Sequence, residues 1–533
     1  MATVSEGLSG IPVWRSVGAS PAPKAFDERQ QTLIVGAGPV GLTIALDLAR
    51  RGHGVTVLNK LDFIPAGSKA ICFAKRTLDI WDRLGVADAM IEKGVRWNVG
   101  KVYRGARENL VYQFDLMPVK DQKMPGFINL QQYYAEEILL QALQRLSNVE
   151  LRWGHEVSAI ESRSDGVEVT VKCSDASYTV GADWLIACDG NKSTIRQRMG
   201  LDFAGRIFED NFLIADVRVK ETRPVERTFW FDPPFNPGRS ALMHKQPDDV
   251  WRLDFQLGAN IDRAACVRPE NVEPLIRGLL GADAEFTPVW YSVYTFQCRR
   301  MKSFVHDRVI FAGDSAHLVS PFGARGCNGG VADAANLGWK LDLVLRGQAP
   351  EALLQTYNYE AIVTADENIL NSSRATDFMT PKTPVSRAFR DAVLELAQEF
   401  PFARPFVNSG RLSTAVSLPD SPLNTPDEHD AEWAGIKPGY PCLDAPTSSG
   451  WLLEQLGEGF VLLTNRCEVR AVTPIQQVEI SDFDTGGVVA SRYDLRPGSA
   501  YLIRPDQYVA ARWRNPTTSA VLAAFDRATG KSA

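Results

Sequence analysis

The sequence lacks the patterns of three kinds of protein. Its eight cysteines are scattered, no two of them closer than Cys173 and Cys188, so they form neither a C-x-x-C pair nor zinc-ligand spacing. The six histidines are scattered too, and we expect no metal site. No run reaches the roughly 18 uncharged apolar residues of a membrane-spanning helix, and the first 29 residues lack the apolar core of a secretion signal. We therefore expect a cytoplasmic protein with reduced cysteines and no membrane partner.

The charge balance excludes further classes of partner. The chain carries 58 basic and 64 acidic side chains, a net charge of −6, without a long run of one sign. Such a chain offers no basic surface to nucleic acid or to an anionic membrane. Hydrophobic residues make up 45% of the chain, which is typical of a globular protein and excludes disorder over its whole length.

A strand, a glycine-rich turn, a helix and a second strand follow one another between residues 32 and 58. Apolar runs at 32–35 and 55–58 mark the strands, and helical periodicity fills the stretch between Leu42 and Ala49. The turn reads Gly-Ala-Gly-Pro-Val-Gly at 36–41. Alone this motif is weak, but its place between a strand and a helix is that of a dinucleotide-binding βαβ unit. The alternative is a glycine-rich turn that binds nothing.

The residues of this turn have separate physical tasks. Gly36 permits the tight turn, Gly38 lets the backbone approach a pyrophosphate, and Gly41 lets the helix pack closely on the sheet. Pro39 and Val40 open the helix, whose positive end faces the phosphates.

The acidic residue that binds a ribose hydroxyl in many dinucleotide sites is missing. Asn59 and Lys60 stand at the end of the second strand instead. An amide still binds a hydroxyl, but as a neutral and weaker partner than a carboxylate. Ribose is therefore held by Asn59 and its neighbours, or this contact is partly lost, and the position does not exclude NADP.

A second polar turn follows the apolar strand at 184–187. Asp189 and Gly190 form the turn, and Ser193 is placed to cap the helix that comes next. Arg196 would pair with a phosphate or with Asp189. The alternative is a capped turn with a structural ion pair.

A third turn follows the strand at 309–312. Asp314, after Gly313, is placed to accept hydrogen bonds from a polyol chain. A glycine-rich loop then leads into a long helix that ends near Leu345. The amides at 326–328 form a positive helix end, which suits a ring that becomes anionic.

The rest of the chain divides into segments that differ in hydrophobic pattern and proline content. Between about 205 and 300, apolar and polar residues alternate, as at 251–257, which predicts a sheet with one covered face. Six prolines between 418 and 446 mark a linker, and a small α/β module follows it.

The three turns, in this order, resemble the single-component FAD-dependent aromatic hydroxylases of the p-hydroxybenzoate hydroxylase and phenol hydroxylase kind. The resemblance spans roughly residues 30–395. It implies an α/β fold: a Rossmann-like FAD-binding domain with an inserted β-sheet substrate domain, a helical return segment and a C-terminal thioredoxin-like domain. The boundaries that we predict are an N-terminal extension at 1–29, the FAD-binding domain at 30–205, the substrate-binding sheet at 206–300, the FAD-binding return and helices at 301–400, a linker at 401–446 and the C-terminal domain at 447–533.

The resemblance also implies an FAD site, with departures from the family pattern. Asn59 stands where the family usually has glutamate, Lys69 where it has arginine, and Cys327 where methionine is frequent. Because a lysine is a point charge and not a two-pronged donor, FAD would be held less tightly. The implied FAD-binding residues are Gly36, Gly38, Pro39, Val40 and Gly41 at the pyrophosphate, Asn59, Lys60, Lys69 and Ala70, Gln132 near the ribityl chain, Val157 at the adenine, Asp189, Gly190 and Arg196, and Gly313, Asp314, Pro321, Gly326, Cys327 and Asn328 from the ribityl phosphate to the isoalloxazine.

The implied reaction is hydroxylation of a small phenolic or other electron-rich aromatic substrate. FAD takes a hydride from NADH or NADPH, and O₂ then reacts through a C4a-hydroperoxyflavin. NAD(P)H visits transiently, because the chain has one dinucleotide motif and not two. A flavin-dependent dehydrogenase, oxidase or Baeyer–Villiger-type oxygenase is the alternative on this fold. A flavin-dependent halogenase needs a W-x-W-x-I-P motif, which the sequence lacks. A dinucleotide-binding carrier without enzymatic activity would not explain the second and third turns.

The residues that would touch the substrate are less defined by the sequence. Arg252 projects from one face of the alternating strand, and His244 lies in the same region. A cation there would bind a phenolate or a carboxylate, and a histidine would help to deprotonate a phenol. A solvent-facing arginine and a surface histidine are the alternative. We expect a structural role for His317, and a packing or oligomer role for the C-terminal module, which leaves a homodimer open.

Overall fold

The computed structural model describes residues 13–23, 29–67, 69–106, 108–115, 120–174, 176–407, 412–427 and 433–531. The predicted N-terminal extension falls partly outside these ranges. Its described part includes β1 (Val13–Ser16), which pairs with β4 (Phe63–Pro65). Across the described ranges, no helix is both long and apolar enough to cross a membrane.

The first sheet confirms the Rossmann-like domain that the glycine motif predicts. Its parallel strands lie in the order β10-β3-β2-β13-β20. Because helices cover a parallel sheet on its faces, its strands are continuous apolar runs, and Leu33, Ile34, Leu185 and Ile186 are fully buried. The strands run over Val149–Trp153, Val55–Asn59, Arg29–Val35, Ala176–Ala187 and Val309–Phe311, and β11 (His155–Arg163), β12 (Gly166–Cys173) and β19 (Val305–His306) extend the sheet antiparallel.

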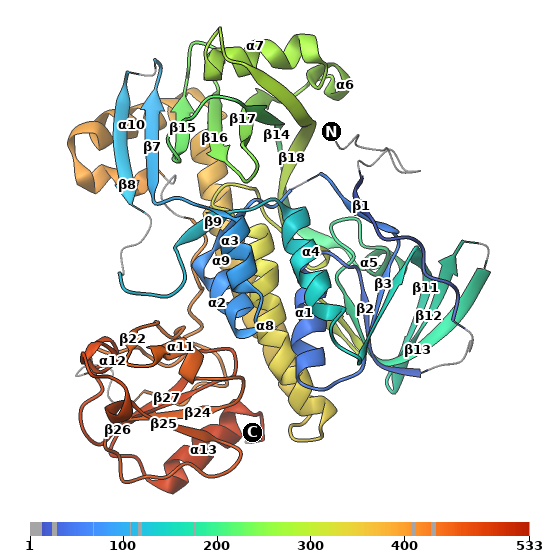
Figure 1. Ribbon diagram of the computed structural model, residues 1–533, viewed down its shortest axis with the longest axis vertical. Coiled ribbons are helices and arrows are strands. Elements are labelled where there is room, and N and C mark those ends of the chain that lie inside the picture. Colours follow the sequence, from blue (N-terminus) through green and yellow to red (C-terminus); the bar gives the residue numbers. More distant parts are fainter. Residues whose placement is uncertain are drawn as a thin grey trace.

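Four helices of this domain form a series of contacts beside the sheet (Figure 1). The helix α1 (Pro39–Arg50) contacts both α4 (Gln132–Leu143) and α8 (Gly326–Leu345), and α9 (Leu353–Met379) packs on α8. The long helix α8 begins at Gly326, so residues 326–328 form its first turn. The remaining elements here are α2 (Lys75–Arg83), α3 (Ala87–Lys93), α5 (Thr194–Arg198), and the small sheet of β5 (Cys72–Ala74), β9 (Phe127–Asn129) and β6 (Val95–Arg96).

The second sheet has the order β21-β18-β14-β17-β16-β15-β7-β8, and all its pairings are antiparallel except β15 with β7. Its apolar outer face packs under α7 (Pro269–Leu280). The helix α10 (Pro384–Glu399) and the 3-10 helix η2 (Pro401–Phe406) pack near β8 and α9. The strands run over His317–Leu318, Phe286–Met301, Phe203–Val219, Val250–Gly258, Ser240–Lys245, Arg227–Phe231, Val99–Arg104 and Leu110–Asp115, and α6 spans Arg263–Cys266.

This sheet differs from the predicted segment 206–300 in two ways. Its strand β14 begins at Phe203, where it already pairs with Met301 of β18, so the boundary at 206 falls inside a strand. Its strands β7 and β8 come from residues 99–115, which the prediction placed in the FAD-binding domain. The parallel pairing of β7 with β15 joins segments more than a hundred residues apart, and short-range periodicity carries no information about such a pairing.

The C-terminal module holds a four-stranded sheet of order β25-β24-β26-β27, with one parallel and two antiparallel pairings. In Figure 1 it lies in red beside α8, well apart from the second sheet in green. Its likeness to thioredoxin stays a prediction, and all eight cysteines of the chain are free. Its elements are β22 (Pro446–Thr447), β23 (Gly450–Trp451), α11 (Leu452–Gln455), β24 (Val461–Thr464), β25 (Gln476–Glu479), η3 (Ile480–Asp482), α12 (Val488–Tyr493), β26 (Ser499–Ile503), β27 (Val509–Arg514) and α13 (Thr518–Ala528).

Candidate functional site

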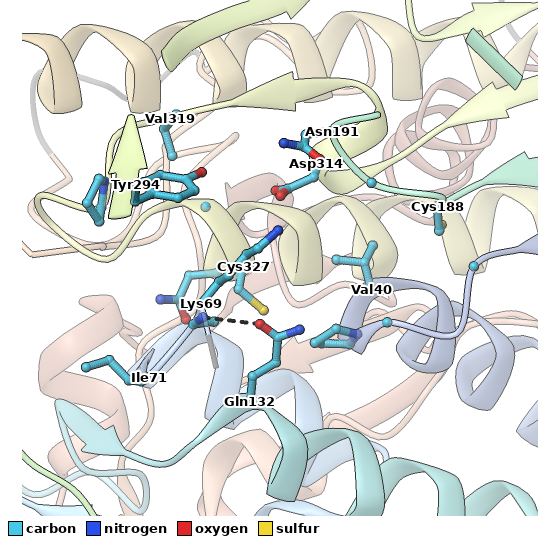
Figure 2. Close-up of a pocket in the computed structure, with 18 of the residues that line it drawn as sticks. Val40, Lys69, Ile71, Gln132, Cys188, Asn191, Tyr294, Asp314, Val319 and Cys327 are labelled. Carbon is cyan, nitrogen blue, oxygen red and sulfur yellow. Dashed lines mark hydrogen bonds between the residues drawn. The ribbon is translucent and has the colours of Figure 1, made fainter. Parts of the chain in front are cut away.

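One cavity of about 460 Å³ brings together the three predicted turns and the inner face of the second sheet. In Figure 2, Asp314 and Asn191 project into it from one side, and Lys69 and Gln132 from the other. Most of the predicted FAD-binding residues line this cavity. They are Gly36, Gly38, Pro39, Val40, Asn59, Lys60, Lys69, Ala70, Gln132, Val157, Asp189, Gly190, Asp314, Pro321, Gly326, Cys327 and Asn328.

The first turn has the geometry of a phosphate cradle. Gly36 has a φ of 110°, and a Cβ atom there would lie 2.3 Å from the carbonyl oxygen of Cys188. At Gly38, a Cβ atom would meet nothing within 4 Å, so the bare backbone faces open space at the N-terminus of α1. Gly41 does not line the cavity, but its Cβ atom would lie 2.0 Å from the Gly36 carbonyl oxygen. Position 41 therefore requires a glycine, because a Cβ atom there would clash with the backbone inside the turn.

The Asn59 side chain braces this turn. Its Oδ1 accepts a hydrogen bond from the Ala37 amide at 3.1 Å, and its Nδ2 donates to the Leu61 carbonyl at 3.0 Å. An aspartate or glutamate would keep the acceptor but lose the donor. The amide thus fits this position better than the carboxylate that the family usually has there.

The second turn is held by its own helix. Ser193 accepts a hydrogen bond from the Arg196 amide and caps α5, as predicted. Asp189 Oδ2 accepts from the Ile195 amide at 3.1 Å, whereas its buried Oδ1 has no partner among the described residues. Burial raises the pKa of the Asp189 carboxyl.

The predicted pairing of Arg196 with Asp189 is wrong. The guanidinium donates to the carbonyls of Ser315 at 2.8 Å and Asn191 at 2.7 Å, and it stacks 3.8 Å from the Phe203 ring centroid. It therefore does not pair with Asp189, and it does not line the cavity. Because it bonds to both loops, Arg196 fixes the second turn against the third.

The third turn depends on a buried carboxylate behind it. Asp333 Oδ2 accepts a hydrogen bond from the Gly313 amide at 2.9 Å and lies 2.6 Å from His317 Nε2. His317 and Gly313 lie outside the cavity lining, and Gly313 packs against Val40. Asp314, in the 3-10 helix η1 (Gly313–Ser315), faces the cavity. Its burial raises the pKa of its carboxyl, and the Lys69 charge opposes this shift.

The flavin-side loop ends in the first turn of α8. The Asn328 side chain ties this turn to the neighbouring β5–α2 segment, because it accepts from the Ala74 amide at 2.9 Å and donates to the Cys72 carbonyl at 2.9 Å. Burial raises the pKa of the Cys327 thiol, which stays protonated. Gln132 Oε1 accepts from the Ala70 amide at 3.2 Å, the dashed line of Figure 2. The turns, the backbone amides at the N-terminal ends of two helices and Asp314 together fit an extended dinucleotide such as FAD.

The inner face of the second sheet carries charged residues that are not exposed. Arg252 and His244 are 3% and 2% exposed, so the alternative of a solvent-facing arginine and a surface histidine is wrong. Arg252 donates to both oxygens of Asp216, at 2.8 and 2.7 Å. His244 Nε2 lies 3.5 Å from Asp254 Oδ2, and its Nδ1 has no partner among the described residues. Burial and the charge of Arg227 lower the pKa of His244 to about 4.

Sequence reasoning missed several residues at this end of the cavity. Arg227 is the clearest omission, since it is 3% exposed and lines the cavity. Its strand reads Arg-Thr-Phe-Trp-Phe and looks like an ordinary buried strand. Only the register with the next strand shows that Arg227 shares a face with His244. The other missed side chains form the apolar and polar wall: Phe212, Ile214, Leu242, Asp254, Tyr294, Phe296 and Phe322.

Comparisons with known proteins agree with this geometry. Residues 29–372 match the family described as FAD binding domain. The 12-dehydrotetracycline 5-monooxygenase/anhydrotetracycline 6-monooxygenase of Streptomyces rimosus is 30% identical, over 90% of this chain and 95% of its own. A 3-(3-hydroxy-phenyl)propionate/3-hydroxycinnamic acid hydroxylase of Klebsiella pneumoniae is 26% identical, over 94% of this chain and 95% of its own.

Solved structures share the whole architecture. The anhydrotetracycline hydroxylase OxyS of Streptomyces rimosus has a TM-score of 0.72 at 26% identity, covering 94% of this chain and 99% of its own. The flavin-dependent monooxygenase PieE, solved with FAD and substrate, has a TM-score of 0.78 at 22% identity, covering 96% of this chain and 100% of its own. The fold therefore extends through the second sheet and the C-terminal module.

Proposed function

Since this chain belongs to the family of FAD-dependent aromatic monooxygenases, we propose that it hydroxylates a phenolic ring held between the three turns and the inner face of the second sheet. The observation that carries this proposal is a single cavity. The glycine-rich cradle and the charged face of the second sheet both line it, so a cofactor and an aromatic substrate would share one space. Relatives named for tetracycline intermediates and for hydroxyphenylpropionate make a phenol the expected substrate class.

The chain's own residues would bind and orient the cofactor. FAD, when bound, supplies the redox chemistry, taking electrons from NAD(P)H and activating O₂. The backbone at Gly36 and Gly38 and the positive end of α1 would hold the pyrophosphate. Asp314 would accept hydrogen bonds from the ribityl hydroxyls, and the backbone amides at the start of α8 would stabilise negative charge on the reduced ring.

On the substrate side, His244 would position the reacting hydroxyl. Its lowered pKa keeps the imidazole neutral near pH 7, so Nδ1 can accept the hydrogen of a phenol O–H. The apolar wall of Phe212, Leu242 and Phe296 would exclude water from the ring. Arg252 is already paired with Asp216, so we assign it a positioning role in place of the substrate contact predicted from the sequence.

Turnover with defined phenols tests this function. We expect the purified, FAD-loaded protein to consume NADH or NADPH faster with 3-(3-hydroxyphenyl)propionate, a naphthol or anhydrotetracycline, and to give a product one oxygen atom heavier with a new ring hydroxyl by NMR. A ring-expanded product would identify a Baeyer–Villiger oxygenase, and a product two hydrogens lighter a dehydrogenase or oxidase. Equal NAD(P)H consumption with and without every aromatic tested would contradict the proposal.

The matched variants are His244→Asn and His306→Asn. We expect the first to lower kcat on the order of 100-fold, the range of positioned acid–base groups. The second changes a histidine outside the cavity lining, bonded to the Ser303 carbonyl, and should leave kcat unchanged. We extend the proposal to O₂ as co-substrate and to action in the cytoplasm. We also propose a homodimer, and size-exclusion chromatography with light scattering would test this oligomeric state.

A further inference from the structure

Charged side chains form a row across the second sheet. The pairing register sets His244 opposite Arg252, and Arg252 opposite Asp216. The pairing of Thr228 with Met243 places Arg227 beside His244 on the next strand. Directly opposed residues project from the same face of a sheet. The row therefore faces the cavity, which Arg227, His244 and Arg252 all line.

Within this row, Arg227 alone lacks a directly paired carboxylate among the described residues, and the charge of Asp254 acts on it only from a longer distance. It forms no ion pair there, and its buried Nε and Nη1 have no hydrogen-bond partner. Its guanidinium lies instead near the rings of Phe229 and Trp97, 4.9 and 5.7 Å from their centroids. Arg252, equally buried, is satisfied by both oxygens of Asp216. The two arginines therefore differ in pairing and not in burial.

An unpaired buried cation is costly, because it has lost its hydration and gained no partner. An arginine stays charged even when its pKa is lowered by burial, so it cannot avoid this cost by losing its proton. The cost is compensated if a ligand brings the missing negative charge. Arg227 lies on the second sheet, whereas the phosphate-binding turns follow strands of the first. Its charge is thus placed for the substrate and not for the pyrophosphate.

We propose that Arg227 binds a negatively charged oxygen group of the substrate, so that this enzyme acts on aromatic anions in preference to neutral phenols. The inference rests on the proposed function and narrows its substrate class. The anionic oxygen is that of a carboxylate or of an ionised phenol, and both present the acceptors that a guanidinium fork recognises. The proposal also replaces Arg252 with Arg227 as the cation that binds the substrate, since the sequence analysis predicted Arg252 for this contact.

The neighbouring His244 links this anion to the reacting hydroxyl. The charged groups that act on it are Arg227 on β15 and Arg252 and Asp254 on β17, and Cys72 on β5 lines the same cavity. Of these, the charges of Arg227 and Arg252 oppose protonation of the imidazole, and Arg227 has the larger effect. An anion seated on Arg227 would offset that charge, so the bound substrate itself would make His244 a better proton acceptor.

Paired probes on the FAD-loaded protein test the proposal without turnover. We would measure the Kd of 3-hydroxy-2-naphthoate and of 3-hydroxy-2-naphthamide by calorimetry, and that of 4-nitrophenol below and above its own ionisation. We expect the wild type to bind at least one anion on the order of tenfold more tightly than its neutral counterpart, as for a charge-assisted hydrogen bond. R227M should lose this preference, and R227K should keep part of it.

A second arginine of the same sheet provides the control for R227M. R218M removes an exposed arginine of β14, bonded to the Asp248 carbonyl, and should keep the wild-type preference. Preference for the naphthoate identifies a carboxylate, and preference for nitrophenolate identifies a phenolate. No preference in the wild type, or an unchanged one in R227M, would overturn the proposal. Loss of FAD from R227M would also overturn it, because the charge would then serve the cofactor.

A second measurement guards against a folding defect. In the absence of ligand, R227M should unfold at a higher temperature than the wild type, because it removes an unpaired buried charge; a lower temperature would mean that Arg227 has a structural partner and would refute the inference. These readouts are independent of hydroxylation. If no phenol is hydroxylated, the anion preference still reports on Arg227, and if hydroxylation occurs without the preference, only this inference fails.

Discussion

Replacing Glu360 with glutamine tests how the C-terminal module is held against the rest of the chain. Glu360 of α9 is fully buried and accepts hydrogen bonds from Lys340 Nζ at 2.7 Å and from Arg504 Nη1 at 2.6 Å. Lys340 belongs to α8, and Arg504 follows β26 in the C-terminal module. The carboxylate therefore joins the module to both long helices of the FAD-binding domain.

The expected loss in free energy of unfolding depends on which charges stay buried without a partner after the substitution. Removing one partner of a buried ion pair costs about 3–5 kcal/mol, because the other charge stays buried. Arg504 keeps a second partner, Asp506, at 2.5 Å. The cost thus falls mainly on Lys340, whose pKa burial already lowers to about 8, so it can lose its proton without Glu360. We expect the lower end of the range, about 3 kcal/mol.

Hydrogen exchange measured by mass spectrometry locates this loss. We expect faster exchange in β26 and β27 of E360Q, with the first sheet and the FAD content unchanged, because Glu360 does not line the cavity. The control is E351Q, which removes the ion pair of an exposed glutamate with the half-buried Arg308 and should change stability by less than about 1 kcal/mol. Equal exchange in E360Q and wild type, or faster exchange spread evenly over the chain, would refute this reasoning.

Three further predictions concern the FAD-binding domain. N59D should weaken FAD binding about fivefold in a fluorescence titration, because it keeps the acceptor for the Ala37 amide and loses the donor to Leu61; tighter binding would show that a carboxylate serves ribose after all. G41A should abolish FAD retention, since its Cβ would lie 2.0 Å from a backbone oxygen; a yellow, stable variant would contradict the packing described. Burial raises the pKa of Glu136 from 4.5 to about 7, so the folded state binds the extra proton and stability should fall by about 3 kcal/mol as pH rises from 4.5 to 7. E136Q should remove that part of the pH dependence, and an unchanged profile would argue against a buried neutral carboxyl.

The three turns could be predicted because their information is local. A strand, a glycine at a fixed offset and a helix cap lie within about ten residues of one another, and each imposes a conformation that few residues adopt. Gly36 and Ser193 take the conformations that the sequence predicts. The fold class and the family follow from their order along the chain.

The substrate end could not be predicted in the same way, because it depends on register between distant strands. Arg227 and Arg252 stand in similar apolar strands, and only the position of Asp216 on β14 decides which of them is paired. Arg196 follows the same logic, since its partners come from two loops and neither is visible in its own segment. The role of Asn59 in bracing the first turn depends on its hydrogen bond with the Ala37 amide, and the sequence does not show that these two groups lie within bonding distance.

The parallel pairing of β7 with β15 has a consequence for any attempt to exchange substrate-recognition regions between relatives. A cassette covering residues 206–300 would leave the donor's β7 and β8 behind, so β15 of the cassette would have to pair with the recipient's own β7. A mismatched pairing there would expose β15 as an aggregation-prone edge. A working chimaera must therefore also transplant residues 99–115. During synthesis, the ribosome must likewise release β21, near residue 318, before that sheet is complete.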